Sequence, residues 1–492
     1  MKLKKLIKEI PAAVIKGNKE IEITGISNDT RRVAPGNLFI AKRGLTHDGA
    51  KLIPEAIAAG AVAVLTDLYD PFYPQVTQVV HPDVPMLEAL LARHFYQCPD
   101  QSLFLVGITG TNGKTTTSYL VKHLLDQKTS PCGLIGSIAR IIGKHAFPAP
   151  QNTPDVITNY KLFHEMVLQQ CASCVMEVTS HGLHQGRVRL IEFDVAVFTN
   201  LTQDHLDYHP SMQAYAEVKA SLFASLSLNA HAVVNADDPW HTLMIDVCPA
   251  QIFTYGIDAP CTLRAENIEL LASGTQFDLV YQGKRAHLKI GLIGRFNVYN
   301  CLAALAVGII RGIPFEKCVF SLSRFTAVPG RLERVENERN LNIFVDYAHT
   351  DDALKNVLET LAEFKKGRLI TVFGCGGNRD PLKRPKMGAV VEELSDIAIV
   401  TSDNPRNEDP GEIIRHILQG FKHPEEAWVE LEREEAIARA INAATPDDIV
   451  LIAGKGHEDY QIFSHQTIAF DDREVAKRLG SCTFSPSPSL SK

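Results

Sequence analysis

The sequence predicts an α/β protein of three domains. Short apolar runs alternate with helical stretches along most of its 492 residues, a pattern typical of largely parallel sheets covered by helices. A typical domain has roughly 100–200 residues, so a chain of this length should contain several. Turn-rich junctions near Pro99 and Gly330 divide it into residues 1–99, 100–330 and 331–482. Residues 483–492 are of low complexity, and we expect a disordered tail there.

The first region predicts a small α/β domain. Its runs IEITGIS, NLFIAK and AVAVLTD are separated by turn signals such as Pro35-Gly36 and Asp48-Gly49. The helical stretch MLEALLARHFYQ then leads to the boundary at Cys98-Pro99-Asp100.

The second and third regions each predict a mostly parallel sheet. In the second, the apolar strand LFLVGIT precedes a glycine-rich loop and a helix that begins near Thr115, and the strands CVMEV, VAVFTNL and HAVVNAD follow. In the third, the strands NIFVDYA, RLITVFG, IAIVTSD and DIVLIAG alternate with helices such as DALKNVLETLAEF and PGEIIRHILQGF. This order predicts a doubly wound, Rossmann-like domain.

Composition indicates a cytoplasmic protein with small-molecule substrates. Hydrophobic residues make up 45% and charged residues 22%, which is ordinary for a globular chain, and the net charge of −7 gives no general attraction to nucleic acid or anionic lipid. No apolar run approaches the roughly 18–20 residues that span a bilayer. Lys8, Glu9 and Pro11 interrupt the N-terminal apolar stretch, so no signal peptide is predicted. We expect a monomer that binds no nucleic acid and does not insert into membranes.

The ten cysteines are scattered along the chain, which suits reduced thiols. Cys171 and Cys174 have the CxxC spacing of redox and zinc sites, but no second pair follows at metal-binding spacing. Since they lie in the apolar run CASCVMEV, we interpret them as small core residues.

The sequence GITGTNGKTTT, at 107–117, predicts a phosphate-binding loop. It lies between a strand and a helix, where glycines let the backbone approach phosphates and the helix N-terminus supplies positive partial charge. The Lys114 ammonium can reach the β- and γ-phosphates, and the hydroxyl of Thr115 or Thr116 can hold Mg²⁺. An ordinary glycine turn before a helix is the alternative. The predicted ATP-binding residues here are Gly110, Thr111, Asn112, Gly113, Lys114, Thr115 and Thr116.

The loop departs from the usual pattern GxxxxGK[ST], because Ile108 occupies the place of the first glycine. The variant GTNGKT resembles the phosphate loop of the Mur ligase family, and the resemblance extends over nearly the whole chain. It implies an ATP-dependent ligase that forms amides through an acyl phosphate. It also implies a uridine-binding first domain, a central ATPase domain and an amino-acid-binding third domain.

Two side chains at strand ends predict a metal site in the central domain. Glu177 ends the strand in MEVTSHGL, where its carboxylate faces the phosphate loop across adjacent strand ends and can bind Mg²⁺. His205, in NLTQDHLDYH, follows another strand, and the resemblance implies that it is a second metal ligand. Either side chain alone is more often structural, and the pair favours a metal site.

The remaining catalytic and nucleotide-binding residues come from the resemblance. It implies that Lys219 in YAEVKASLF is carbamylated by CO₂ and approaches Mg²⁺ as an anion, although a lone lysine on a helix is normally a solvated charge. It assigns Asn297 of GRFNVYN to the adenine, whereas such an amide can also cap the helix. It brings Arg331 and Asp346 to the nucleotide from the third domain, in a VDYAHTDDAL segment that has Asp351 where the family usually has Pro. Lys114, Lys219, Glu177 and His205 are thus the predicted catalytic residues.

The third domain predicts a site for an amino acid with two carboxylates. Arg379, Asp403, Arg406 and Glu458 follow strand ends of one sheet, where open α/β folds bind ligands. Two arginines and two carboxylates suit a zwitterion with two carboxyl groups and two amines. The motif DNPR at 403–406 resembles the signature of the Mur ligases that add meso-diaminopimelate to UDP-N-acetylmuramoyl-L-alanyl-D-glutamate. A surface turn with a solvated arginine is the alternative. The predicted binding residues are Arg379, Asp403, Asn404, Pro405, Arg406, Gly454 and Glu458.

Three segments resemble the family's site for the UDP-linked substrate. NDTRRVAPGNLFIAKRG resembles its uridine-binding segment, with Thr30 in place of the usual Ser, and the next loop carries Leu45, Thr46 and His47. QNTPD and the segment TSHGLHQGR match its central contacts, although each hydroxyl there can instead cap a turn or a helix. The residues assigned from these two segments are Asn152, Thr153, Thr179, Ser180, Gln185 and Arg187. The resemblance also implies that the third domain closes on the second.

Three other functions are compatible with parts of the sequence. Folylpolyglutamate synthetase has a similar phosphate loop, but about 100 residues precede the loop here. A small-molecule kinase would need no amine, and a non-catalytic nucleotide-binding protein would need neither metal ligands nor a second substrate pocket.

Overall fold

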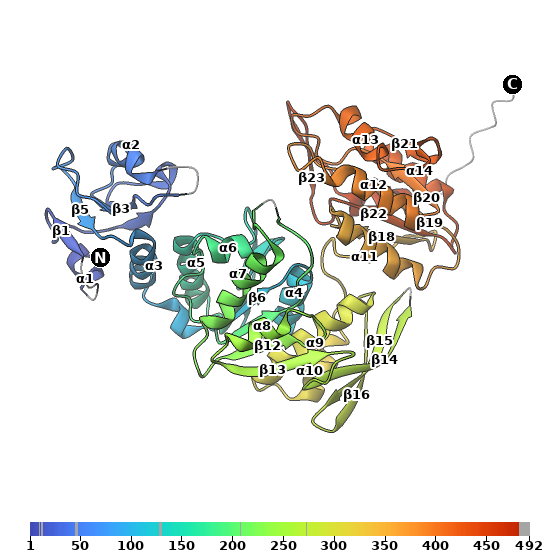
Figure 1. Ribbon diagram of the computed structural model, residues 1–492, viewed down its shortest axis with the longest axis horizontal. Helices are drawn as coiled ribbons and strands as arrows, with labels where there is room; N and C mark the ends of the chain where they lie inside the picture. The colour runs from blue at the N-terminus through green and yellow to red at the C-terminus, as the bar shows by residue number, and fades with distance from the viewer. Residues whose placement is uncertain are drawn as a thin grey trace. The chain divides into compact units, whose positions relative to one another are not determined.

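The computed structural model describes residues 1–8, 10, 13–44, 48–126, 130–206, 208–271 and 273–481 (Figure 1). The chain forms two compact units. Unit 1 comprises Met1–Thr262 with Ala303–Phe315, and unit 2 comprises Leu263–Leu302 with the chain from Glu316 onward. Leu45, Thr46 and His47, and the tail predicted at 483–492, lie outside the described residues.

The N-terminal part of unit 1 contains a five-stranded sheet in the order β1-β5-β4-β3-β2. Its strands are β1 (Val14–Lys16), β5 (Thr77–Val80), β4 (Ala63–Thr66), β3 (Asn37–Ile40) and β2 (Gly25–Ser27). All neighbours are parallel except β1, which runs antiparallel to β5. Successive side chains of β3 alternate between two cores: Leu38 and Ile40 join one cluster, and Phe39 joins the other. The predicted helix is α3 (Val84–Phe95).

The central sheet of unit 1 has the order β13-β12-β11-β6-β10-β7-β8-β9. Its strands are β13 (Gln251–Gly256), β12 (His231–Asn235), β11 (Val195–Phe198), β6 (Phe104–Thr109), β10 (Ser173–Glu177), β7 (Cys132–Ile135), β8 (Ala139–Ile142) and β9 (His145–Pro148). The strands from β13 to β7 are parallel, and β8 and β9 add an antiparallel edge. Strand β6 therefore lies between β11 and β10, so the loop that follows β6 meets the loops that follow both neighbours.

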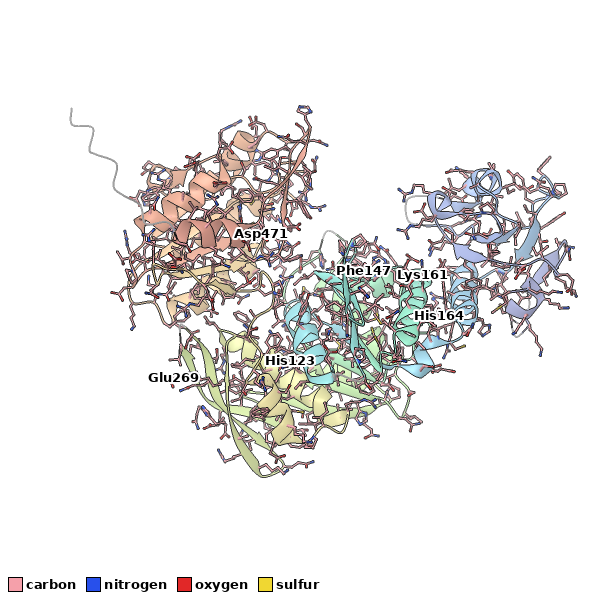
Figure 2. All side chains as sticks on the ribbon, turned by 180° about the vertical axis from the view of Figure 1, so that it is seen from behind. His123, Phe147, Lys161, His164, Glu269 and Asp471 are labelled. Carbon is pink, nitrogen blue, oxygen red and sulfur yellow. The ribbon has the colours of Figure 1, made fainter. Side chains whose placement is uncertain are left out.

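Helices and core residues of unit 1 agree with the prediction. Helix α4 (Lys114–Leu125) packs on β6, β7 and β10, and α7 (Met212–Ala224) starts with a cap from Ser211. His164 on α5 (Val156–Leu168) contacts Tyr96, with ring centroids 5.9 Å apart (Figure 2). Cys171 and Cys174 are buried in the core, which confirms that they are core residues.

Unit 2 begins with an antiparallel sheet that the sequence analysis did not single out. It consists of β14 (Leu263–Leu271), β15 (Gly274–Tyr281) and β16 (Lys284–Ile290). Helix α9 (Arg295–Ile310) follows, and its residues from Ala303 onward belong to unit 1. Helix α10 (Phe315–Leu322) precedes the turn at Pro329-Gly330.

The C-terminal sheet of unit 2 has the predicted doubly wound character. Its order is β17-β18-β22-β19-β20-β21. Its strands are β17 (Glu333–Val335), β18 (Asn342–Asp346), β22 (Ile449–Ala453), β19 (Leu369–Phe373), β20 (Ile397–Val400) and β21 (Trp428–Val429). All neighbours are parallel except β17.

Helices cover both faces of this sheet. The helices α11 (Asp351–Ala362), α12 (Lys383–Leu394) and α13 (Pro410–Leu418) share one core, and α14 (Arg433–Ala443) and α15 (Asp472–Ser481) share the other. Phe344 faces the first core, while Ile343 and Val345 face the second. Because both faces of the sheet are buried, these strands are continuous apolar runs in the sequence.

Candidate active site

Hydrogen bonds connect the phosphate loop to the loop that follows β11. Backbone N–H groups of Thr111 and Asn112 donate to Asn200, at 2.8 Å to its carbonyl oxygen and 2.9 Å to its side-chain oxygen. The Thr199 hydroxyl donates to the Asn112 carbonyl at 2.6 Å. Gly110 has φ +148°, and a Cβ there would overlap the Thr199 hydroxyl. The loop is thus built for close backbone contact, as the sequence predicted.

Two lysines converge on this loop. The Lys114 ammonium donates to the carbonyls of Gly110 (2.9 Å) and Thr111 (2.7 Å), and Lys219 on α7 donates to the same Gly110 carbonyl at 2.9 Å. Lys219 is only 1% exposed, so the alternative of a solvated charge is wrong. Burial, and secondly the nearby Lys114, hold the pKa of Lys219 well below its usual value. Both effects favour the unprotonated amine over the ammonium.

Glu177 ends β10 with its carboxylate fixed beside the phosphate loop. In the sheet, Glu177 lies opposite Ile108 of β6, so the predicted placement at adjacent strand ends is confirmed. Ser137 donates to both carboxylate oxygens, from its N–H at 2.9 Å and its hydroxyl at 2.7 Å. The Thr115 hydroxyl lies 3.5 Å from the Ser137 hydroxyl. These three oxygen-bearing side chains fit a hard cation such as Mg²⁺.

His205 lies in the loop after β11 with 43% of its side chain exposed and with φ +55°. Its ring centroid is 4.8 Å from that of His181 and 6.1 Å from that of Tyr215. Among the described residues, no group of three or more His, Cys, Asp or Glu side chains is arranged to hold a metal. Mg²⁺ bound by few protein groups, together with phosphates and water, is compatible with this finding.

The residues predicted to bind the UDP-linked substrate divide into internal and exposed groups. The buried Thr153 hydroxyl donates to the Glu177 carbonyl at 2.8 Å, and the Thr179 hydroxyl accepts from Gly182 N–H as the cap of α6 (Ser180–His184). The Ser180 hydroxyl is buried without a hydrogen-bond partner in the described chain. Asn152 is exposed, and Thr30 lies in the 3₁₀ turn η1 (Thr30–Arg32).

Gln185 and Arg187 form a polar group beside the loop that carries His205. Arg187 donates to the Gln185 side-chain oxygen at 2.7 and 3.1 Å and to the Thr153 carbonyl at 2.8 Å. The hydroxyl of Tyr208 accepts from Gln185 at 3.3 Å and pairs with His184 Nδ1 at 2.8 Å. Tyr208, which the sequence analysis missed, thereby connects this polar group with the loop that carries His205.

In unit 2, the loops after β19, β20 and β22 meet at one edge of the sheet. The Asn404 side chain donates to Glu458 at 2.7 Å, and Arg406 donates to the Gly377 carbonyl at 2.8 Å. Gly454 has φ +113°, and a Cβ there would lie 2.7 Å from Asp403 Oδ2. Arg379 is exposed, and its Cγ would lie 3.7 Å from a Cβ on Gly376. The structure thus brings together the residues predicted for the amino acid.

Charge in this cluster is partly compensated. Burial and the neighbouring Asp403 carboxylate raise the pKa of Glu458, while the Lys455 ammonium opposes part of this shift. Lys455, which the sequence analysis missed, is fully buried and lies 3.4 Å from Glu458. Its position between the predicted residues Gly454 and Glu458, directly after β22, was the available signal.

The other predicted nucleotide residues also lie in unit 2. The Asn297 side chain donates to the Ile293 carbonyl at 2.7 Å and accepts from the Asn300 side chain at 2.9 Å. The Arg331 guanidinium lies over the Tyr347 ring, 4.5 Å from its centroid. Asp346 accepts from Leu332 N–H at 2.6 Å and Ala348 N–H at 2.7 Å. Burial raises the pKa of Asp346, while Arg331 opposes the shift.

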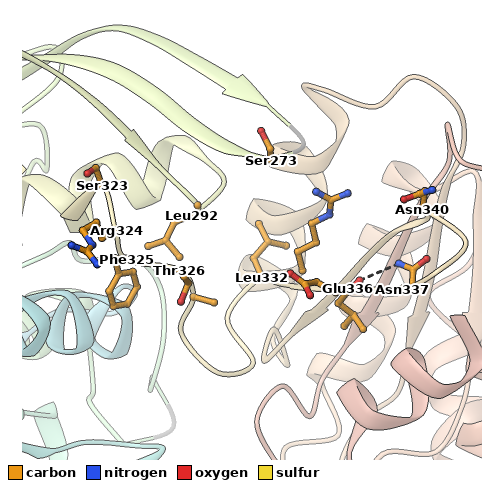
Figure 3. A pocket seen from close by; sticks show the side chains of 14 residues that line it. Ser273, Leu292, Ser323, Arg324, Phe325, Thr326, Leu332, Glu336, Asn337 and Asn340 are labelled. Atoms are coloured by element: carbon orange, nitrogen blue, oxygen red, sulfur yellow. Dashed lines mark hydrogen bonds between the residues drawn. The ribbon is translucent and has the colours of Figure 1, made fainter. Parts of the chain in front are cut away.

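A separate cavity of about 820 Å³ lies in unit 2. Ser273, Leu292, Arg324 and Leu332 are among the residues that line it (Figure 3). Its lining includes none of the residues predicted to bind nucleotide, metal or amino acid.

The fold and the phosphate loop define a P-loop enzyme of the α/β class. Three successive segments match family models: residues 22–96 match "Mur ligase family, catalytic domain", residues 108–308 match "Mur ligase middle domain", and residues 330–456 match "Mur ligase, glutamate ligase domain". The three predicted domains are thereby confirmed, while their boundaries at 99, 330 and 482 stay predictions.

Full-length relatives agree with this match. The chain is 42% identical over 481 residues to UDP-N-acetylmuramoyl-L-alanyl-D-glutamate–2,6-diaminopimelate ligase 1 of Clostridium acetobutylicum, which covers 97% of this chain and 99% of the relative. It is 44% identical over 482 residues to the 2,6-diaminopimelate ligase of Chlamydia caviae, with 97% and 99% covered. The chain belongs to the Mur ligase family and is an ATP-dependent acid–amino-acid ligase.

Solved structures support the same assignment. A UDP-N-acetylmuramoyl-L-alanyl-D-glutamate–2,6-diaminopimelate ligase superposes with a TM-score of 0.71 at 32% identity, covering 97% of this chain and 98% of the other. Mycobacterium tuberculosis folylpolyglutamate synthase superposes with a TM-score of 0.61 over 74% of this chain and 91% of its own, at 20% identity. The second likeness concerns the fold alone. No helix in the described part of the chain has the length and apolar character that crossing a membrane requires.

Proposed function

We propose that this enzyme joins meso-diaminopimelate to UDP-N-acetylmuramoyl-L-alanyl-D-glutamate and hydrolyses ATP to ADP and phosphate, as a step of peptidoglycan precursor synthesis. The cluster around Arg406 carries this proposal: it sets two arginines, Asp403 and Glu458 at one edge of a sheet. Relatives that bear this substrate in their names, at 42–44% identity over nearly the whole chain, support it.

The phosphate loop performs the nucleotide half of the reaction. The N–H groups at the start of α4 and the Lys114 ammonium neutralise charge on the β- and γ-phosphates. For this role Lys114 must exchange its hydrogen bonds to Gly110 and Thr111 for bonds to phosphate oxygens. Asn297, Arg331 and Asp346 complete the nucleotide site in our proposal.

Mg²⁺ is the cofactor in this proposal, held by Thr115, Glu177, His205 and a carbamate on Lys219. When bound there, the ion would neutralise negative charge on the phosphoryl oxygens. Burial of Lys219 lowers its pKa and so favours the unprotonated amine that a carbamate requires: the amine lone pair attacks the carbon of CO₂, an N–C bond forms as one C=O π bond opens, and one proton is released to solvent. The product is an anion beside the phosphate loop. A carbamate at this position would attract the Lys114 ammonium, whereas an ammonium on Lys219 would repel it.

The reaction proceeds by two displacements. A γ-carboxylate oxygen of the D-glutamate attacks the γ-phosphorus of ATP, the bond from that phosphorus to the bridging oxygen breaks, and an acyl phosphate and ADP form. The amine of diaminopimelate then attacks the acyl carbon. Phosphate leaves with the C–O bonding electrons, and the amine loses a proton. Phosphorylation supplies the leaving group that a carboxylate lacks.

The two organic substrates occupy separate residue sets. The UDP-linked substrate contacts Thr30, Leu45, Thr46 and His47 in the N-terminal part. In the central part it contacts Asn152, Thr153, Thr179, Ser180, Gln185 and Arg187. The Arg406 fork and Arg379 pair with carboxylates of diaminopimelate, and Asp403, Asn404 and Glu458 accept from or orient its amines. Pro405 and Gly454 shape the pocket. We further propose that the enzyme acts as a monomer in the cytoplasm.

Phosphate release tests this function. The enzyme with ATP, Mg²⁺ and UDP-N-acetylmuramoyl-L-alanyl-D-glutamate should release phosphate with meso-diaminopimelate and much more slowly with L-lysine. Turnover with lysine alone would refute the role of the Arg406 cluster, and turnover with neither amine would refute the assignment. Phosphate transfer that requires no amine would instead indicate a kinase.

A further inference from the structure

Hydrogen bonds connect two loops at the proposed amino-acid site, residues 376–378 and residues 404–408. The Gly377 N–H donates to the Asn404 carbonyl at 2.9 Å, and the Asn407 N–H donates to the Asn378 side chain at 3.1 Å. Both Asn378 (φ +52°) and Arg406 (φ +54°) have left-handed backbone conformations. Such conformations are costly for residues other than glycine, so the surrounding contacts must hold them.

The position of the Arg406 guanidinium depends on the first of these loops. Its Nη1 donates to the Gly377 carbonyl at 2.8 Å, and a Cβ on Gly376 would lie 2.9 Å from the same nitrogen. A displacement of residues 376–378 would therefore move the guanidinium or release it.

A buried arginine on α12 supports both loops. Arg384 is 1% exposed, and its Nη2 lies 3.0 and 2.9 Å from the two carboxylate oxygens of Glu408 and 3.4 Å from the Gly376 carbonyl. Its Nη1 lies 3.0 Å from His416 Nδ1. Because a buried cation is costly without a partner, Glu408 is required to keep Arg384 in place.

Glu408 connects this arginine to the loop that holds Arg406. One of its carboxylate oxygens also accepts the Asn378 N–H, and its own N–H donates to the Pro405 carbonyl at 3.1 Å. Burial favours the neutral acid, but the Asn378 N–H and the Arg384 guanidinium outweigh it, so the pKa of Glu408 is lowered. The carboxylate is charged at neutral pH and accepts strong hydrogen bonds.

We propose that Arg384 and Glu408 are positioning residues that fix the Arg406 guanidinium, and that they thereby determine selectivity for an acceptor amino acid with a second carboxylate. This inference rests on the proposed function of the Arg406 cluster. Both residues act on the Arg406 guanidinium through Asn378, Gly376 and Gly377.

Glu408→Gln tests the proposal with little change of shape. It should raise the KM for meso-diaminopimelate about tenfold, because a charge-assisted hydrogen bond becomes a neutral one, while kcat and the KM for ATP stay within about twofold. The rate with L-lysine should hardly change, so the preference for meso-diaminopimelate should fall by about the same factor. Arg384→Lys, which keeps the charge and loses the planar fork, should act in the same direction.

A double-mutant cycle separates positioning from general stability. In an Arg406→Ala background, Glu408→Gln should cause no further loss of selectivity, because no guanidinium remains to be positioned. The matched control is Glu434→Gln, which removes another Glu–Arg pair (2.7 Å from Arg478) on helices α14 and α15. It should leave both KM values unchanged.

The outcomes distinguish this inference from the proposed function. A wild-type enzyme that prefers meso-diaminopimelate, with a Glu408→Gln variant of unchanged KM and selectivity, would overturn the inference alone. Equal losses of kcat with both amines and a lowered melting temperature would also overturn it, since they indicate only a structural role. A wild-type enzyme without preference for meso-diaminopimelate would overturn both.

Discussion

Lys114 and Lys219 donate hydrogen bonds to the same carbonyl oxygen, that of Gly110, each at 2.9 Å. The Lys114 ammonium disfavours a second positive charge at Lys219, which is the more buried of the two. Burial, and secondly the repulsion from Lys114, lower the pKa of Lys219 and favour its unprotonated form next to the phosphate loop.

Lys219→Ala should reduce phosphate release by about a thousandfold or more, because the carbamate anion beside the phosphate loop is lost. Lys219→Arg should be similarly inactive, since a guanidinium stays protonated and does not react with CO₂. Lys161→Ala, on the exposed face of α5 (Figure 2), is the control and should keep full activity. In the wild type, ¹³C-labelled bicarbonate should give a carbamate signal that Lys219→Ala lacks. Full activity of Lys219→Ala would contradict the carbamate proposal.

Ser137→Ala should weaken the response to Mg²⁺. The substitution removes one of the two hydrogen bonds that fix the Glu177 carboxylate. Loss of such an orienting contact typically costs about 10- to 100-fold in metal affinity. The measurement is the Mg²⁺ concentration for half-maximal phosphate release at saturating ATP. Ser221→Ala, at an exposed serine of α7 whose hydroxyl donates to the Val218 carbonyl of the same helix, is the control. An unchanged Mg²⁺ dependence would remove Glu177 from the metal site.

Arg406→Lys should raise the KM for meso-diaminopimelate by about tenfold or more while the KM for ATP stays the same. Lysine retains the charge but cannot form the two parallel hydrogen bonds that a guanidinium gives to a carboxylate. Steady-state kinetics with each substrate varied in turn measure this difference. A loss of ATP affinity instead would show that the DNPR loop serves the nucleotide.

His457 should make the protein less stable in mildly acidic solution. Burial, and secondly Arg331, lower the pKa of His457 from 6.5 to about 4, and its Nδ1 is buried without a hydrogen-bond partner in the described chain. Between these two pKa values the unfolded chain binds the proton and the folded chain does not. The contribution of His457 to the free energy of unfolding is therefore fully present above pH 6.5 and is lost progressively as the pH falls toward 4.

Thermal unfolding measures this effect. The melting temperature of the wild type should fall between about pH 7 and about pH 5, and His457→Gln, which does not titrate, should show a smaller fall. His145→Gln, at an exposed position of β9, is the control. An identical fall in the wild type and His457→Gln would refute this contribution.

Much of the fold followed from local patterns. Strands such as β6, β10 and β19 are continuous apolar runs because both of their faces are buried, and this makes them recognisable in the sequence. The antiparallel strands β14–β16 were missed, because their alternating, partly exposed residues give a weaker signal. Lys455 and Tyr208 were also missed, although both lie beside predicted site residues, because their roles arise from contacts with other loops or with residues of the same loop that only the folded chain shows.

The sequence by itself determined the class of enzyme. The glycines and Lys114 of the phosphate loop must occupy fixed positions along the chain, because one continuous turn has to surround the phosphates. The same holds for the DNPR motif at the end of β20. These are local requirements, and a linear pattern records them.

Only the tertiary structure decided the state of the side chains around these motifs. Lys219 is one of 50 lysines and arginines in the sequence, and its pKa is lowered because it is buried against a loop 109 positions away. The dependence of Arg406 on Arg384 and Glu408 likewise arises where α12 meets two loops. Burial and the distance between charges depend on how distant segments pack, so they set pKa values and positions that no local pattern contains.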